Sequence, residues 1–287
     1  MTDRPVLLSF GHGYSARALS RRLLAEGWRV IGTTRSVEKA EILRAEGVEP
    51  VLSLEAAADH LAEATHVLVS AGPDAEGDPV LTACGPAIAA ARHLAWAGYL
   101  STTGVYGDRQ GGWVDETSDC CPSTRRGQWR LAAEQAWQAL PDLPLHIFRL
   151  AGIYGPGRGP FAKVRNGTAR QIIKPGQVFS RIHVEDIATV LEASIARPDP
   201  GAIYNVCDDE AAPPQDVLAH AAELLDLPPP PAMDFETAEM SPMARSFYAE
   251  SKRVSNTRIR EGLGVTLAYP SYREGLAALL AEEQGPA

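Results

Sequence analysis

The sequence predicts an α/β fold: a doubly wound, mostly parallel sheet of the Rossmann type with a small C-terminal α/β lobe. Short apolar runs alternate with helical patterns through the first half of the chain, as in parallel sheets whose strands are buried on both faces. The first run, Val6–Phe10, breaks into Gly11 and Gly13 and then enters an amphipathic stretch. This order of strand, glycines and helix is typical of a dinucleotide site.

The expected strands of the N-terminal half are Val6–Phe10, Arg29–Thr33, Pro50–Leu52, His66–Ser70, Gly98–Thr102 and Leu145–Leu150. The helices expected between them are Ala16–Glu26, Val37–Glu46, Glu55–Ala62, Val80–Trp96 and Gln128–Leu140. Helical crossovers between such strands imply a parallel sheet with right-handed connections.

Beyond Gly155 the alternation loosens. The elements expected there are the helices Ile182–Ala196, Pro214–Leu225 and Tyr272–Glu283 and the strand Ala202–Val206. The prolines at 228–231 must interrupt any helix, because proline lacks the N–H and clashes with the preceding turn. We expect a dinucleotide-binding domain over 1–155 and a smaller substrate lobe over 156–287, interleaved with the sheet and lying over the carboxyl ends of its strands.

Composition excludes several classes of function. An apolar fraction of 45% is that of an ordinary globular protein, and a net charge of −9 argues against nucleic acid as a partner. No apolar run approaches the roughly 20 residues of a membrane span, and the N-terminus lacks the pattern of a signal peptide. The four cysteines are scattered without metal-site spacing. We therefore expect a cytoplasmic protein with reduced thiols and no metal.

The segment from Gly11 to Ala16 has the residue types that hold a pyrophosphate. Gly11 allows a tight turn, Gly13 leaves no side chain between backbone and phosphate, and Ala16 lets helix and strand pack closely. Tyr14 and Ser15 open the helix, whose free N–H groups then face the anion. The alternative is a glycine-rich turn without a ligand.

The end of the second expected strand favours NADP over NAD. Thr34, Arg35 and Ser36 occur there without an acidic residue, and an arginine with small hydroxyl residues suits the 2′-phosphate of NADP. The alternative is a surface arginine that caps a loop. Ala71 and Gly72, after the fourth strand, are small enough to let a dinucleotide pass close to the backbone.

With these residues placed, nearly the whole chain resembles the extended short-chain dehydrogenase/reductase family, the NAD(P)-dependent epimerase/dehydratases. Four segments carry the resemblance: Ser101 to Gly107, which closes on V-Y-G; Arg149 to Arg158, which contains I-Y-G-P-G; Arg181 to Ala188; and Tyr204 to Val206. The resemblance implies that Thr102 holds the substrate oxygen and that Gly152 lies near the cofactor. It also leaves open a homodimer through the helices Val80–Trp96 and Gln128–Leu140.

One departure from the family pattern concerns the catalytic pair. Family members carry a tyrosine four residues before a lysine, but when the segment is anchored on Glu134, Arg126 takes the tyrosine position and Arg130 the lysine position. No Y-x-x-x-K occurs in this segment. Arginine stays protonated at physiological pH, so Arg126 cannot exchange the proton that accompanies hydride transfer. Arg130 still supplies positive charge near the nicotinamide ribose.

Tyr106, Tyr154 and His183 are the candidates to replace that tyrosine as proton donor. The two tyrosines follow strand ends expected at the cleft, and His183 lies in the motif of the C-terminal lobe. The alternative is that the tyrosines pack beneath their loops and that His183 bonds the backbone. Together, Arg126, Arg130, Arg158 and Arg181 form either a cationic wall around an anionic substrate or four unrelated arginines. Two hypotheses follow: an NADP-dependent oxidoreductase or epimerase with a non-standard acid, and a cofactor-binding regulator or redox sensor without chemistry.

Overall fold

The computed structural model describes residues 4–285, and its centre is a seven-stranded, entirely parallel sheet. The strand order is β11-β7-β5-β4-β1-β2-β3. From β1 the chain first adds β2 and β3 on one side and then β4 and the later strands on the other, which is the arrangement of the doubly wound dinucleotide-binding fold. The fold class predicted from the sequence is confirmed. The strands of this sheet are β1 (Val6–Phe10), β2 (Arg29–Thr33), β3 (Glu49–Val51), β4 (His66–Val69), β5 (Trp96–Thr102), β7 (Leu145–Leu150) and β11 (Ile203–Val206).

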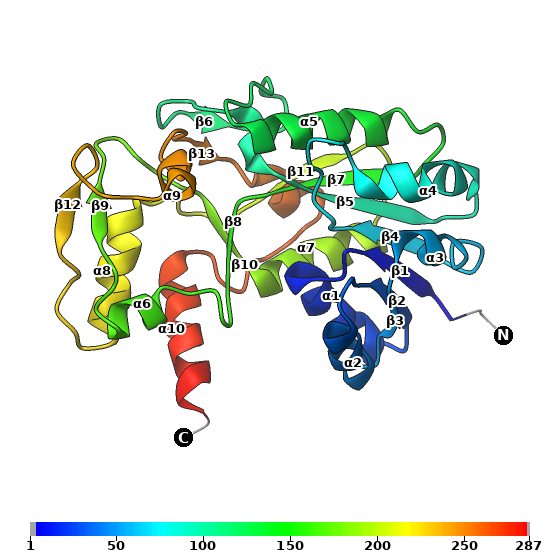
Figure 1. Cartoon of the computed structure of the whole chain (residues 1–287), viewed down its shortest axis with the longest axis horizontal. Helices are drawn as coiled ribbons and strands as arrows, with labels where there is room; N and C mark the ends of the chain where they lie inside the picture. The colour runs from blue at the N-terminus through cyan, green and yellow to red at the C-terminus, as the bar shows by residue number, and fades with distance from the viewer. Residues whose placement is uncertain (1–3, 286–287) are drawn as a thin grey trace.

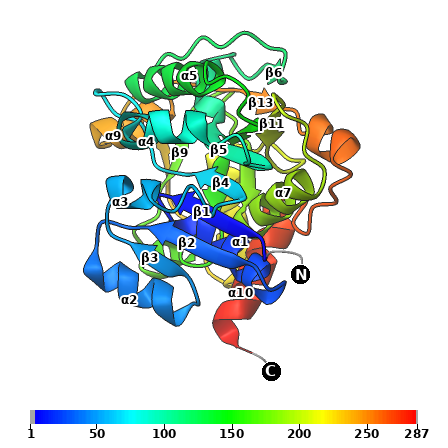
Figure 2. The ribbon, with the colours of Figure 1, turned by 90° about the vertical axis from the view of Figure 1, so that its right-hand side faces the viewer.

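Helices cover both faces of this sheet (Figure 2). The helices packed on one face are α1 (Tyr14–Ala25), α2 (Val37–Ala45) and α7 (Val184–Ala196), and those on the other are α3 (Leu54–Ala58), α4 (Pro79–Ala90) and α5 (Arg125–Gln138). An apolar core lies on each face of the sheet, and successive residues of β1 point into opposite cores. Leu7 packs with α1 and α7, whereas Leu8 packs with α3 and α4. Burial on both faces explains why these strands read as continuous apolar runs.

Several expected helices begin or end elsewhere in the structure, and the helix that begins at residue 79 differs most. The helix expected over Val80–Trp96 stops at Ala90, because Trp96 opens β5 and its buried indole donates to Ser194 Oγ at 3.0 Å. A Cβ on Gly98 would lie 2.1 Å from the Trp96 ring, so this strand needs a glycine beside the tryptophan. Similarly, Ile182 belongs to the strand β10 (Arg181–His183), and the following helix α7 begins at Val184.

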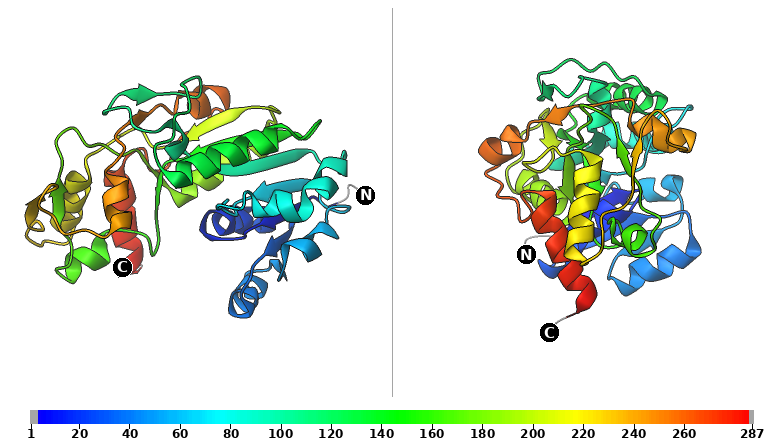
Figure 3. Two further views of the ribbon diagram at one scale, coloured as in Figure 1. Left: turned by 45° about the horizontal axis from the view of Figure 1, so that its top comes forward. Right: turned by 90° about the vertical axis from the view of Figure 1, so that its left-hand side faces the viewer.

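The C-terminal lobe lies beyond the carboxyl ends of the strands (Figure 1). In this lobe α8 (Pro214–Leu224) and α10 (Tyr272–Gln284) pack side by side around a third apolar core (Figure 3). The other elements of the lobe are α6 (Phe161–Arg165), β9 (Gln171–Ile173), β12 (Ala232–Asp234) and α9 (Pro242–Phe247). No helix within residues 4–285 is long and apolar enough to cross a membrane.

Two short strand pairs connect the sheet domain to the lobe. In one, β10 pairs with β8 (Gly152–Tyr154); in the other, β13 (Arg253–Val254) pairs with β6 (Trp113–Val114). Because these strands have two or three residues each, their sequences carry no periodic pattern that predicts them. They position the segments around residues 102, 154, 181 and 252 beside one another.

Candidate active site

Two cavities meet at the carboxyl end of β5. The first, which we call the glycine-loop cavity, measures about 410 Å³ and is lined by Gly11, Gly13, Tyr14, Ser15, Ser70, Leu100, Ser101, Thr102, Arg130, Leu150, Ala151, Ile153 and Arg158. The second, the lobe cavity, measures about 600 Å³. Thr102, Ala151 and Ile153 line both cavities. A ligand in one cavity therefore lies next to a ligand in the other.

The glycine loop has a backbone that only glycine tolerates at its first position. Gly11 has a φ of +73°, and a Cβ there would lie 2.6 Å from the backbone nitrogen of Ala71. Gly13 is the N-cap residue of α1, which has no side-chain cap, so N–H groups at this end remain for a ligand. Ala16 is completely buried where α1 packs on the sheet. This geometry suits a pyrophosphate.

Two arginines complete the glycine-loop cavity. Arg158, on the loop after β8, lies over the ring of Tyr14 at 4.2 Å, and the Tyr14 hydroxyl donates to the carbonyl of Pro156 at 3.0 Å. Arg130, on α5, donates to the Tyr99 hydroxyl at 3.0 Å and to the Leu100 carbonyl at 2.9 Å. Both guanidinium groups thus supply positive charge beside the N-terminus of α1.

The remaining cofactor candidates lie outside this cavity. Ala71 packs against Gly11, and a Cβ on Gly72 would approach Arg130 Nη2 to 3.4 Å. Ser36 caps α2 and accepts from the Lys39 N–H at 3.2 Å, and Thr34 Oγ1 accepts from the Ser36 N–H at 3.4 Å. Arg35 is exposed, and among the described residues no carboxylate lies within 4 Å of it. Gly152 lines the lobe cavity instead.

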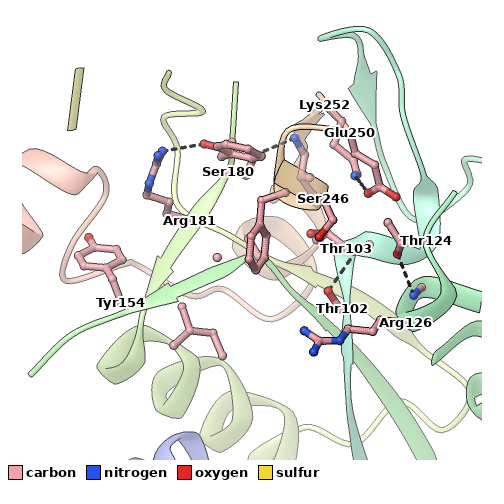
Figure 4. Close-up of a pocket in the computed structure, with 18 residues that line it drawn as sticks. Thr102, Thr103, Thr124, Arg126, Tyr154, Ser180, Arg181, Ser246, Glu250 and Lys252 are labelled. Carbon is pink, nitrogen blue, oxygen red and sulfur yellow. Dashed lines mark hydrogen bonds and ion pairs between the residues drawn. The ribbon is translucent and has the colours of Figure 1, made fainter. Parts of the chain in front are cut away.

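The lobe cavity brings together residues from both parts of the chain (Figure 4). Its lining residues are Thr102, Thr103, Gly104, Thr124, Arg126, Gly127, Ala151, Gly152, Ile153, Tyr154, Phe179, Ser180, Arg181, Ser246, Phe247, Glu250, Lys252 and Val254. Thr102 stands at the boundary with the glycine-loop cavity, and its Oγ1 accepts from the Gly104 N–H at 3.2 Å. The Thr102 hydroxyl proton is therefore available to a substrate oxygen.

Tyr154 and Arg181 line the lobe cavity, as the sequence predicts. The Tyr154 hydroxyl donates to the carbonyl of Ser271 at 3.3 Å, and burial raises the pKa of this phenol above its ordinary value. Arg181 Nη1 donates to the carbonyls of Phe179 at 2.9 Å and Ala212 at 3.0 Å. Both side chains therefore hold the lobe together as well as face the cavity.

The structure corrects the expected position of Tyr106 at the cleft. Tyr106 is completely buried: its hydroxyl donates to Asn205 Oδ1 at 2.7 Å and accepts from Arg149 at 3.0 Å. Burial raises the pKa of this phenol to about 12. Tyr106 is therefore part of a buried polar network beneath β5 and lines neither cavity.

His183 also lies behind the cavity wall. Its Nδ1 accepts from the Glu185 N–H at 3.3 Å and so caps α7. The imidazole packs between the rings of Tyr154 and Tyr269, and burial lowers its pKa to about 4. A neutral capping imidazole that lines neither cavity does not contact a substrate there.

The four arginines do not form a single wall. Arg130 and Arg158 line the glycine-loop cavity, whereas Arg126 and Arg181 line the lobe cavity. Within residues 4–285, none of the four has a carboxylate oxygen within 4 Å. All four positive charges are thus without a direct acidic partner, and they are divided between two sites.

The lobe cavity contains a pair of charged residues that were not predicted from the sequence. Lys252 Nζ and Glu250 Oε2 are 2.7 Å apart, and Glu250 Oε1 accepts from Ser123 Oγ at 2.6 Å. The signal was present, because Tyr248 and Lys252 have the Y-x-x-x-K spacing, although in the lobe and not on α5. The Tyr248 ring packs against Phe179 and Phe235, so only the lysine of this pair lines the cavity.

Curated relatives cover almost the whole chain. "Protein YeeZ" of Escherichia coli K12 is 29% identical over 276 residues, which is 91% of this chain and 94% of the relative. A "3-diazoavenalumate denitrifying reductase" from a Streptomyces species is 30% identical over 151 residues, 48% of each chain. No protein-family model matches the sequence.

Solved structures extend the comparison. A candidate NAD-dependent epimerase/dehydratase from Methylobacillus flagellatus is 26% identical over 98% of this chain and 99% of its own, with a TM-score of 0.74. The fold is shared with MoeE5 in complex with UDP-glucose and NAD, at a TM-score of 0.73, 21% identity and coverage of 96% and 97%. A functionally unknown conserved protein from Silicibacter pomeroyi is 62% identical over 97% of this chain and 99% of its own, with a TM-score of 0.93. The chain therefore belongs to the family of conserved proteins that the Silicibacter pomeroyi protein represents, and several proteins that share its fold are named as epimerases or dehydratases.

Proposed function

We propose that the protein is an NADP(H)-dependent oxidoreductase or epimerase that acts on a small metabolite. The observation that carries this proposal is the junction of the two cavities at Thr102. A dinucleotide with its pyrophosphate at the N-terminus of α1 has its nicotinamide end toward this junction, and a substrate in the lobe cavity then lies against it. The names of the structural neighbours, which include NAD complexes, support a nicotinamide cofactor.

NADP is the proposed form of the cofactor. Arg35 follows β2, next to the strand that leads into the glycine loop, and it is exposed. An arginine at this place binds a 2′-phosphate through paired N–H donors, and no aspartate or glutamate follows β2 directly to bind the free 2′-hydroxyl of NAD. Thr34 and Ser36 add hydroxyl groups on either side.

When bound, the nicotinamide supplies or accepts a hydride. The chain's own part is to hold the substrate oxygen and manage its charge. Thr102 donates a hydrogen bond to that oxygen, and Arg126, on the first turn of α5, stabilises negative charge that develops there. Because Arg126 keeps its proton, the proton that is exchanged comes from another residue of the cavity lining. Tyr154 and Lys252 are the candidates, since each lines the cavity and carries a proton.

A second candidate function is a cofactor-binding regulator or redox sensor without hydride chemistry. The observation that favours it is that α5 carries Arg126 and Arg130 at the positions where the resemblance implies a tyrosine and a lysine. Arg130 lines the glycine-loop cavity, so we propose cofactor binding there under both hypotheses.

Hydride transfer separates the two functions. The experiment is to mix the purified protein with NADPH and a panel of aldehydes, ketones and enones, and to follow absorbance of the reduced nicotinamide. An enzyme oxidises NADPH with at least one member, and Thr102→Val lowers that rate by roughly a hundredfold, as the loss of a transition-state donor does. A protein that binds NADPH but oxidises it with no member, and no faster than buffer, is not a reductase of these compounds, and this result favours the regulator over the oxidoreductase.

A further inference from the structure

Positive charge is concentrated in the lobe cavity. Three cations, Arg126, Arg181 and Lys252, line it together with a single carboxylate, Glu250. The whole chain carries a net charge of −9, so the cavity has the opposite sign to the molecule around it. A cleft lined by one sign of charge attracts and retains ligands of the other sign.

Lys252 is a buried cation in the wall of the lobe cavity. The residue is 9% exposed, and its ammonium is paired with Glu250 Oε2 at 2.7 Å. Glu250 is itself fixed by the hydroxyl of Ser123. A lysine ammonium has three N–H donors, so the pairing with Glu250 leaves donors for a ligand.

The charges at the two ends of the cavity are balanced differently. Figure 4 shows Arg181 beside Tyr154 on one side and Lys252 with Glu250 on the other. Arg181 lies near the buried carboxyl group of Asp208, but burial raises the pKa of Asp208 to about 8, so Asp208 is mostly protonated at neutral pH and does not neutralise Arg181. At the other side, the Lys252–Glu250 pair is neutral as a unit. Arg126, exposed at the rim, therefore leaves one positive charge in excess at that side.

The rest of the lining is largely apolar. Phe179, Phe247, Ile153 and Val254 all line the cavity. Aromatic and aliphatic walls with a few placed polar groups are typical of sites for small organic ligands. The ligand that matches this lining has an apolar or aromatic body and a charged end.

We propose that the lobe cavity binds an organic carboxylate whose carboxylate group accepts hydrogen bonds from Lys252 and is neutralised by Arg126. This inference rests on the proposed function, since it names the substrate class of the same site. A carboxylate carries one negative charge, which equals the one excess positive charge on the side of Lys252, Glu250 and Arg126. A phosphate monoester carries about −1.5 to −2 at neutral pH.

The first test uses three probes: cinnamate, its neutral amide cinnamamide, and phenyl phosphate. Binding to the full chain is measured by saturation-transfer NMR, with and without NADPH. Cinnamate binds, and cinnamamide binds at least about tenfold more weakly, since a charge-assisted hydrogen bond is lost. Phenyl phosphate binds no more tightly than cinnamate.

Two variants then test the residues. Lys252→Met keeps the aliphatic stem and removes the charge, so it weakens cinnamate by roughly tenfold or more. Glu250→Gln removes a negative charge from the wall, so it strengthens cinnamate by about threefold. If the Lys252–Glu250 pair only holds the wall in place, both variants change the affinity for cinnamate in the same direction. The matched control is Lys163→Met on α6, an exposed lysine outside the cavity, and it leaves cinnamate unchanged.

Three results overturn the proposal: equal binding of cinnamate and cinnamamide, tighter binding of phenyl phosphate, or no binding of cinnamate at roughly 10 mM, weaker than the affinities of small-molecule sites. If Lys252→Met does not fold, the comparison of cinnamate with cinnamamide and the Glu250→Gln variant still test the proposal. NADPH titration of the same samples reports separately on the glycine-loop cavity. Cinnamate binding without NADPH binding therefore contradicts the proposed function and not the carboxylate site.

Discussion

Arg149 and Glu134 form a buried ion pair of 2.8 Å beneath the end of β5, with side-chain exposures of 5% and 1%. The hydroxyls of Ser101 and Tyr106 join this pair, which thereby fixes the segment that carries Thr102 to the boundary of the two cavities. Such a network is costly to break, because removal of one partner leaves a buried charge without compensation.

Glu134→Ala should therefore destabilise the fold by about 3–5 kcal/mol. The measurement is the free energy of unfolding from urea denaturation of wild type and variant. Glu41→Ala is the matched control, because Glu41 makes an exposed ion pair with Arg44 on α2 and its removal should cost less than about 0.5 kcal/mol. Equal effects of the two substitutions would show that the buried pair contributes no more than a surface pair.

Gly11→Ala should abolish cofactor binding and lower stability. Its φ of +73° strains any side chain, and its Cβ would lie 2.6 Å from the backbone of Ala71, so the loop must move away from the pyrophosphate position. Gly27→Ala is the control for strain alone, since Gly27 also has a positive φ but a Cβ there meets nothing within 4 Å. NADPH titration and thermal unfolding of both variants separate the two effects, and unchanged NADPH binding by Gly11→Ala contradicts the placement.

Asp208→Asn should stabilise the protein at alkaline pH. Burial raises the pKa of Asp208 to about 8, whereas an aspartate in the unfolded chain has a pKa near 3.9. Between these pH values the folded state binds more protons than the unfolded state. The stability of the wild type therefore falls as pH rises from about 4 to 8. An amide removes this loss, by roughly 1–3 kcal/mol. Unfolding of both proteins at pH 5 and pH 9 measures it; a gain confined to pH 5 contradicts the assignment.

Arg35→Asp should weaken NADPH more than NADH, by about 1–3 kcal/mol, because it replaces a charge-assisted contact with repulsion. Calorimetric titration with both nucleotides measures the difference. Lys39→Asp, an exposed lysine on α2, makes the same change of charge nearby and controls for long-range electrostatics. Equal weakening of both nucleotides by Arg35→Asp removes Arg35 from the site.

The sheet and the glycine loop were predictable from the sequence, and much of the lobe was not. Strands such as Val6–Phe10 and Leu145–Leu150 are buried on both faces, so most of their residues are apolar and the strands can be recognised in the sequence. The strands around Gly152 and Arg253 are too short for any period and depend on pairing with distant segments. Their existence follows from tertiary contacts and not from local pattern.

The candidate site divides in the same way. Gly11, Gly13 and Arg130 follow from a local motif and its spacing, and they line one cavity together. Tyr106 and His183 lie at the ends of the expected elements, yet which way their side chains turn is decided by partners distant in sequence, Asn205 and Arg149 for the first and Tyr269 for the second. Lys252 was missed for the same reason, because β13 brings it to the cavity through its pairing with β6.

We propose above all that the glycine-loop cavity, which Gly11, Gly13 and Arg130 line, holds NADP(H). The most direct measurement is fluorescence titration of the purified protein with NADPH and NADH, with Arg130→Leu alongside the wild type. We expect saturable NADPH binding that is at least roughly tenfold tighter than NADH binding and that is weakened in Arg130→Leu. If neither nucleotide binds to folded wild-type protein, the glycine-loop cavity is not a dinucleotide site.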